Sequence, residues 1–251
     1  DPNIVQISSG ATLPTVPVLT FNQTSAGGFT LNATNNPGRT FIVAEDEKGK
    51  RLAHLAVSVK AQQTVRYHVL RLRDALNNTA MSITETEPIL KNVEILYLNQ
   101  TNVRLLKGKT GEIQIKRVLS DANGVLQLQE VFDNKEDIIF DEVKARNFFD
   151  AEVVVVFTWP IEGADPPRTT GKKLLGRTTP GRFRTGPRMI YINSIGKGGP
   201  SHAFTVAHEF GHHFGLEHSG PRPQTFLMDK SGTSGFKMTQ DDINTVNPSG
   251  T

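Results

Sequence analysis

Residues 208–218 read HEFGHHFGLEH and contain four histidines, three of which are separated by four and then six positions. In a helix, His208 and His212 project from one face about one turn apart, so both imidazoles reach one small cation. Gly215 predicts a left-handed cap that ends the helix and lets His218 swing back towards the other two. Three imidazoles leave one position on a tetrahedral ion for water, the ligand count of a catalytic zinc. We therefore predict that His208, His212 and His218 bind one catalytic Zn²⁺.

Glu209 is the predicted general base. It adjoins the first ligand on the flank of the same helical face, where its carboxylate reaches a water on the metal without binding the ion. An HExxH string by itself also occurs by chance on polar helices. Here five positions agree with the pattern, and the string follows a predicted strand and lies in an amphipathic helix. These features favour a metal site over an ordinary polar helix.

The stretch resembles the HExxHxxGxxH signature of the metzincin zinc endopeptidases. That family has a methionine turn after the third histidine, and TFLMDKSG supplies Met228 downstream of His218. The resemblance implies that Met228 forms a hydrophobic floor beneath the metal and is not a ligand. Ser219 and residues 238–247, MTQDDINTVN, are similar to the matrixin branch. By position, Asp242 would help to fix the methionine turn.

The resemblance is strong over residues 201–247, and over 63–200 it extends only to the order of elements. Residues 160–200 lack the histidines and the acidic run that bind structural zinc and calcium in matrixins. No tyrosine follows Met228, so the zinc-binding tyrosine of astacins and serralysins is missing, and the chain has no pro-segment cysteine. The resemblance therefore implies a divergent, matrixin-like peptidase that acts on a protein or peptide.

Strand and helix patterns alternate after about residue 63, which predicts an α/β domain over 63–251. The resemblance implies that this catalytic domain has a mixed, mostly parallel twisted sheet and an active-site helix. The run AEVVVVFTWPI, residues 151–161, is typical of a central buried strand. An edge strand that pairs with the substrate is expected within 171–188. The other predicted strands are 63–74, 102–119 and 187–195, and the predicted helices are 85–100, 135–149, 201–218 and 238–247.

Two of these helices have candidate N-caps. Thr86, followed by Pro88 in the first turn, is the predicted N-cap of the helix over 85–100. Ser201 is the predicted N-cap of the helix that carries the histidines. The apolar face predicted for the first of these helices consists of Ile89, Val93, Ile95, Leu96 and Leu98.

Residues 1–62 contain short strand patterns about a dozen residues apart, separated by turn residues. This rhythm predicts a small all-β domain, an immunoglobulin-like sandwich, ahead of the catalytic domain. The segment has one histidine, His54, and no clustered chemistry, so we interpret it as an accessory or docking module.

The composition fits a globular protein of 251 residues with a net charge of +3 and no cysteine. The lack of cysteine excludes disulfides and thiol nucleophiles. No apolar run approaches the length of a membrane span. The basic stretch 168–188 carries seven Lys or Arg residues and is either a solvated loop or a basic rim beside a cleft. Its only aromatic residue is Phe183, which argues against nucleic-acid binding.

The other candidate ligands are weaker. His213 should point away from the metal, His202 should serve as a cap or lie on the surface, and His54 and His68 fit ordinary strand patterns. Several acidic residues could gather a structural calcium ion, but their spacing fits no EF-hand loop, and a solvated helix flank is the favoured interpretation. These residues are Asp133, Glu136, Asp137, Asp141 and Glu142.

Three functions remain open at this point. The first is a secreted or otherwise extracytoplasmic endopeptidase, and the second is a peptidase effector or toxin delivered into a target cell. The third is a non-catalytic, metal-stabilised binding module, against which the intact Glu209 argues. The chain begins DPNIVQ, without Met or a basic-then-apolar leader, so we expect it to be a processed or excised form. The oligomeric state is left open.

Overall fold

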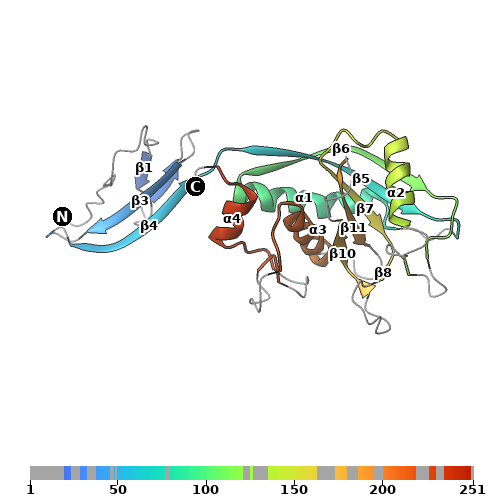
Figure 1. Cartoon of the computed structure of the whole chain (residues 1–251). Coiled ribbons are helices and arrows are strands. Elements are labelled where there is room, and N and C mark those ends of the chain that lie inside the picture. Colours follow the sequence, from blue (N-terminus) through green and yellow to red (C-terminus); the bar gives the residue numbers. More distant parts are fainter. Residues whose placement is uncertain are drawn as a thin grey trace. The chain divides into compact units, whose positions relative to one another are not determined.

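A computed structural model of the chain describes residues 20–23, 29–32, 38–45, 48, 50–76, 80–120, 125–126, 135–162, 173–179, 186–194, 200–218, 226–229 and 235–249. The chain divides into two compact units, residues 1–63 with 247–251 and residues 64–246. Figure 1 traces both units. The division into domains at 1–62 and 63–251 stays a prediction.

The first unit contains two antiparallel strand pairs. Strands β1 (Thr20–Gln23) and β2 (Phe29–Asn32) form one pair, and β3 (Gly38–Glu45) and β4 (Arg51–Val59) form the other. The end of the chain belongs to this unit, because the Asn247 side chain donates to the Ala61 carbonyl at 2.8 Å. The strands agree with the predicted β segment, and the immunoglobulin-like sandwich stays a prediction.

A five-stranded sheet organises the second unit. Its order is β10 (Gly176–Thr178), β11 (Arg188–Asn193), β7 (Val153–Thr158), β5 (Gln63–Arg73) and β6 (Val103–Gln114). Strands β5 and β11 run parallel to β7, whereas β10 is antiparallel to β11. The short strands β8 (Ile161–Glu162) and β9 (Lys173–Leu174) pair separately. The predicted mixed, mostly parallel sheet is thus confirmed.

Strand β7 lies at the centre of the sheet because its sequence suits burial on both faces. All six residues of VVVVFT are buried. Such a continuous β-branched and aromatic run is characteristic of a parallel strand covered by helices on both sides. The predicted central strand over 151–161 is therefore confirmed, and β10 is an edge strand within 171–188, as expected.

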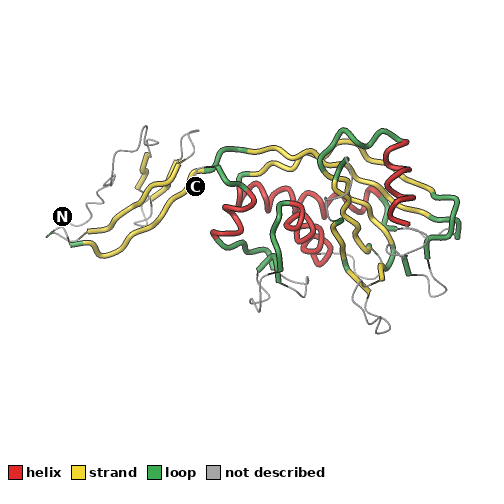
Figure 2. The backbone as a smooth tube through the Cα atoms, in the orientation of Figure 1, coloured by secondary structure: helices red, strands yellow, loops and turns green. Residues whose placement is uncertain are grey.

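Helices cover both faces of the sheet (Figure 2). The described residues form four: α1 (Ile83–Thr101), α2 (Lys135–Ala145), α3 (Pro200–His213) and α4 (Gln240–Val246). Val155 and Ile190 pack in a core with α1 and α3, while Val156 and Tyr191 pack in a second core with α2. Because successive side chains of a strand point to opposite faces of the sheet, each strand contributes residues to two separate cores. Among the described residues, no helix has the length and apolar character needed to cross a membrane.

The predicted N-caps of α1 and α3 are wrong. Ser82 caps α1, because its hydroxyl accepts the Glu85 N–H at 3.3 Å and the Glu85 carboxylate accepts the Ser82 N–H at 2.9 Å. This reciprocal capping box starts the helix four residues before Thr86, whose hydroxyl donates to the Ile83 carbonyl inside the first turn. Helix α3 begins at Pro200, so Ser201 lies within the helix and not before it.

The predicted apolar face of α1 is only partly buried. Ile89, Val93 and Leu96 lie in the core, but Ile95 and Leu98 remain 45% and 40% exposed. The apolar face of α1 is therefore wider than the part of the helix that the sheet and α3 cover.

Replacing Ser82 with alanine removes the side-chain half of the capping box. We expect Ser82→Ala to lower the free energy of unfolding by about 1 kcal/mol, measured by urea denaturation. Ser82→Thr, which keeps the hydroxyl, should lose much less. Equal stabilities of the alanine and threonine variants would show that another group caps α1.

Candidate metal centre

Helix α3 brings two of the predicted ligands together. His208 and His212 lie one turn apart, and each ring is held by a hydrogen bond from Nδ1–H to a backbone carbonyl. The His208 bond goes to Leu227 at 2.7 Å and the His212 bond to Leu216 at 2.8 Å. A carbonyl only accepts, so Nδ1 carries the proton on both rings, and each Nε2 presents a lone pair.

Helix α3 ends at His213, two residues before the break predicted at Gly215. Gly215 has a φ of 89°, a left-handed conformation that costs glycine little. The Leu216 N–H donates to the Gly211 carbonyl at 2.9 Å, and the Gly215 N–H donates to the His212 carbonyl at 3.1 Å. These two bonds form a Schellman motif, which reverses the chain after α3. The reversal places His218 beside the two helical histidines.

The three imidazoles converge on one point. The Nε2 atom of His218 lies 2.9 Å from that of His208 and 3.2 Å from that of His212. The ligand nitrogens of the three residues, one from each, all lie within 4.8 Å of one another. Nitrogens bound to a tetrahedral zinc at about 2.0–2.1 Å lie about 3.3 Å apart. The observed separations are close to that value.

The chemistry of this donor set fits a metal ion. Lone pairs on His208 and His212 face the same nitrogen of His218, and a single proton cannot satisfy all three atoms. Burial also lowers the pKa of His208 to about 4, which keeps the ring neutral and able to bind metal at neutral pH. The carbonyl bonds to Nδ1 are the outer contacts that orient histidine ligands in metal sites. The His208, His212 and His218 triad could therefore hold one Zn²⁺.

Glu209 is buried beneath the edge strand β10. The Thr178 hydroxyl lies 2.6 Å from the Glu209 Oε2 and donates to it. Burial raises the pKa of Glu209 to about 7, although the Thr178 hydrogen bond and the Arg177 charge act in the opposite direction. Gly176 of the same strand passes so close that a Cβ there would lie 2.8 Å from the Glu209 carboxylate. Two residues of β10 thus confine this side chain.

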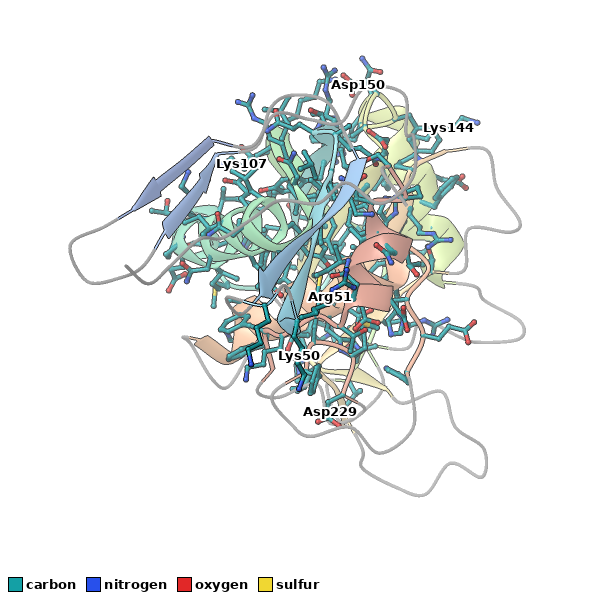
Figure 3. The ribbon with its side chains drawn as sticks, turned by 90° about the vertical axis from the view of Figure 1, so that its left-hand side faces the viewer. Lys50, Arg51, Lys107, Lys144, Asp150 and Asp229 are labelled. Atoms are coloured by element: carbon teal, nitrogen blue, oxygen red, sulfur yellow. The ribbon has the colours of Figure 1, made fainter. Side chains whose placement is uncertain are left out.

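Met228 lies in a turn directly against α3. The Asp229 N–H donates to the Phe226 carbonyl at 3.2 Å and closes the turn; Asp229 is labelled in Figure 3. Met228 is 1% exposed, and a Cβ on Gly211 would lie only 2.5 Å from its sulfur. Because Gly211 has no side chain, the methionine turn can approach α3 closely. This approach lets the Leu227 carbonyl reach His208.

Arg188 stabilises the end of α3 from strand β11. Its guanidinium donates to the carbonyls of His212 and His213 at 2.7 and 2.9 Å. These carbonyls lie in the last turn of the helix, where intrahelical partners run out and the helix dipole favours a cation. Arg188 thereby fixes the position of the second ligand relative to the sheet.

Helix α1 anchors α3 from the other side. The buried Tyr97 hydroxyl donates to the Ala207 carbonyl at 2.7 Å, and its ring packs 5.2 Å from that of Phe214. Phe210 also makes an edge-to-face contact with Tyr67 of β5 at 5.6 Å. Because Ala207 and Phe210 flank His208 and Glu209 in sequence, these contacts position the first half of the site.

Asp242 caps helix α4. Its carboxylate accepts the Thr239 N–H at 2.9 Å, while its own N–H donates to the Thr239 hydroxyl at 3.1 Å. The role at the methionine turn expected for Asp242 stays a prediction.

Ser219, which suggested the matrixin branch, lies outside the described residues, as does most of the basic stretch 168–188.

The weaker candidate ligands include the other histidines and the acidic residues. His213 is not part of the histidine group that could hold a metal, and its buried Nδ1 has no hydrogen-bond partner among the described residues. His202 is buried at 5% exposure, so its expected surface position is wrong. His68 is structural, because its Nε2 lies 2.8 Å from Asp150 and its Nδ1 accepts the Lys109 N–H. The side chains of His54, Asp133, Glu136 and Asp137 lie outside the described residues.

Gly211, Thr178 and Arg188 contact the site but are missing from the sequence-based prediction. Only Gly211 had a local signal, since a glycine inside an amphipathic helix often marks a close approach. Thr178 and Arg188 belong to strands that reach α3 through the tertiary fold, and nothing in their neighbouring sequence marks them.

No protein-family model and no curated protein matches the sequence. The structure is similar to metalloproteinase-II from Bacteroides fragilis, with 16% identity, 73% of this chain and 52% of that chain covered, and a TM-score of 0.42. It is also similar to a chain in the structure of a chaperone–substrate complex, with 15% identity, coverages of 88% and 35%, and a TM-score of 0.36. This chain thus spans about half the length of the first structure. Both TM-scores are low, so any function must be inferred from the site itself.

Zinc titration of the metal-free protein should give a single site per chain by calorimetry. We expect His218→Ala to weaken zinc binding by more than about a hundredfold, because even changes to outer contacts cost up to that amount. His213→Gln is the matched control and should retain the affinity of the unchanged protein. Equal affinities for all three proteins would place the metal elsewhere.

Adding a methyl group at position 211 should separate the methionine turn from α3. We expect Gly211→Ala to lower the free energy of unfolding by about 1–3 kcal/mol, through overpacking against the Met228 sulfur. In a Met228→Ala background the same change should cost less, because the clashing atom is gone. Denaturation of all four proteins of this cycle measures the coupling, and additive effects would refute the contact.

Proposed function

We propose that the protein is a zinc-dependent endopeptidase of the metzincin type. The observation that supports this proposal is the convergence of three histidine Nε2 atoms, two of them on the helix that also carries the buried Glu209. His208 and His212 have their tautomers set by carbonyl bonds, and His218 is returned by the turn at Gly215. Three neutral imidazoles with one remaining position are the donor set of catalytic zinc rather than structural zinc.

Zn²⁺ held by the triad would polarise the scissile carbonyl and lower the pKa of the attacking water. Glu209 would accept a proton from the attacking water at its carboxylate as the water oxygen bonds to the carbonyl carbon, and would pass that proton to the amine nitrogen as the C–N bond breaks. The buried position of Glu209 and its pKa of about 7 suit a group that must both take and release a proton near neutrality. The Thr178 hydroxyl holds one carboxylate oxygen, which leaves the other for proton transfer.

Strand β10 is the proposed docking edge for the substrate. It is the last strand on its side of the sheet among the described residues, and its inner face touches Glu209. An extended peptide that pairs with this edge would run past the triad. Protein or peptide substrates are therefore proposed.

Replacing Glu209 with glutamine tests the role of the carboxylate without removing a ligand. We expect Glu209→Gln to lower the rate of peptide cleavage by about 10²–10⁴-fold, because glutamine cannot accept the proton. Zinc binding should remain at one ion per chain. Cleavage is measured on a mixed peptide library with mass-spectrometric identification of products.

The control variant is Glu217→Gln, an exposed carboxylate close in sequence to the triad. It should cleave at the rate of the unchanged protein, and chelator should abolish both activities. If the Glu209 variant cleaved as fast as the control, the base would be another group. A zinc-loaded protein that cleaves no member of the library would instead support the non-catalytic binding module.

A further inference from the structure

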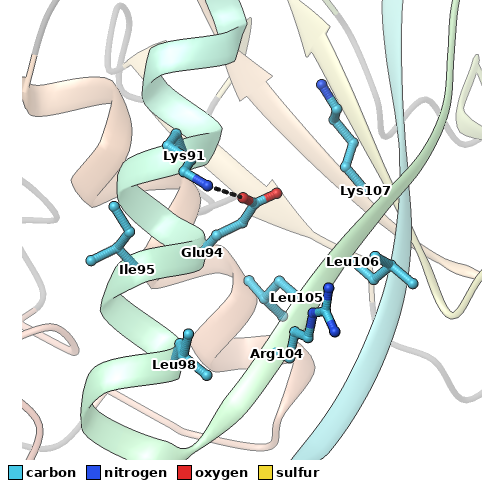
Figure 4. Close-up of a pocket in the computed structure, with 8 residues that line it drawn as sticks. All are labelled: Lys91, Glu94, Ile95, Leu98, Arg104, Leu105, Leu106 and Lys107. Carbon is cyan, nitrogen blue, oxygen red and sulfur yellow. Dashed lines mark ion pairs between the residues drawn. The ribbon is translucent and has the colours of Figure 1, made fainter.

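A groove of about 310 Å³ runs between helix α1 and strand β6 (Figure 4). Ile95 and Leu98 line it from the helix, and Arg104 and Leu106 line it from the strand. Its volume is at the lower end of small-molecule sites, and its lining is exposed, so it suits a few side chains of a larger partner.

The apolar lining of this groove is unusual for the molecule. Seven large hydrophobic residues are exposed in the part of the chain that the structure describes, and three of them are among the residues that line this groove. They are Ile95, Leu98 and Leu106, with exposed fractions of 45%, 40% and 37%. Single exposed apolar residues need no explanation, but a cluster rimmed by polar groups marks an interaction site.

The charges around the groove are mostly positive. Lys91, Arg104 and Lys107 line it together with one acid, Glu94. Glu94 accepts the Tyr67 hydroxyl at 2.9 Å and lies 3.8 Å from Lys91, and Lys107 pairs with Glu87 of α1. The exposed Arg104 has no ion-pair partner among the described residues. A partner with a carboxylate would supply one.

Strand β6 is also an edge strand. It is the last in the order β10-β11-β7-β5-β6, so one side of its backbone has no strand partner within the described residues. Proteins often protect such edges with lysines that reach into solvent. The lysine beside this groove is instead tied to α1 through Glu87, which leaves the edge next to Arg104 and Leu106 open.

We propose that this groove binds an extended segment of another polypeptide that carries alternating apolar and acidic side chains. The segment adds a strand to the free edge of β6, which satisfies the backbone groups of both chains. Because successive side chains of a strand alternate in direction, its apolar residues contact Ile95 and Leu98 and its acids reach Arg104. The proposal is independent of whether the histidine site hydrolyses peptides.

The test uses the full chain carrying Glu209→Gln, so that a bound probe survives. The probe is a fluorescein-labelled peptide of alternating Glu and Val, about eight residues long to match a typical strand. Fluorescence anisotropy should detect its binding, and a Lys and Val peptide of equal length should bind much more weakly. Hydrogen exchange should show new protection of the backbone amides of residues 104–107 in the complex.

Two pairs of variants locate the site. Arg104→Glu and Ile95→Asp should each weaken binding of the Glu and Val peptide by at least about tenfold, by charge repulsion and by loss of the apolar contact. Arg66→Glu, on an exposed residue of β5, and Leu76→Asp, on the most exposed large hydrophobic residue, should leave binding unchanged. Circular dichroism confirms that all four variants are folded.

Three results would overturn the proposal. The first is no binding of the Glu and Val peptide at millimolar concentration, and the second is binding that all four variants retain. The third is a dimer, detected by sedimentation, that Ile95→Asp dissociates, because a second copy of the chain would then be the occupant. Binding without protection of residues 104–107 would refute the added strand.

Discussion

The abrupt end of helix α3 is the constraint on which the metal site depends. A helix that continued past Gly215 would carry His218 around the cylinder and away from its partners. The left-handed turn instead brings His218 back and presents the Leu216 carbonyl to His212. Arg188 donates to the carbonyls of His212 and His213 in this last turn. One backbone conformation therefore determines the third ligand, the tautomer of the second and the contact with the sheet.

The sheet supports this site by keeping its two faces distinct. Contacts among Tyr97, Tyr67 and Phe210 hold α3, which carries two of the histidines, against one face of the sheet. The opposite face packs against α2, and there His68 is held between Asp150 and Lys109. Both edges of the sheet are exposed among the described strands, β10 beside the histidines and β6 beside α1. In the two proposals, the same architecture offers one edge for chemistry and another for binding.

Local patterns predicted most of the second unit, and the misses come from a competing local signal in one case and from long-range contacts in the others. The VVVVFT run and the HEFGHHFGLEH stretch signal burial and ligand spacing within a few residues of themselves, so β7 and the triad were foreseeable. The cap at Ser82 was missed because Thr86 offers the same side-chain chemistry four positions later. Thr178 and Arg188 reach α3 from strands, and their roles depend on a register that a single sequence does not reveal.

The closeness of β10 to Glu209 links substrate recognition to catalytic chemistry in the proposed enzyme. Gly176 has no room for a side chain, and Thr178 is already committed to the carboxylate. Two of the three residues in this strand are therefore unable to vary without disturbing the base. New substrate preferences would have to evolve at other positions around the histidine site, while Gly176 and Thr178 would remain unchanged. Directed-evolution libraries for this protein should leave these two residues untouched.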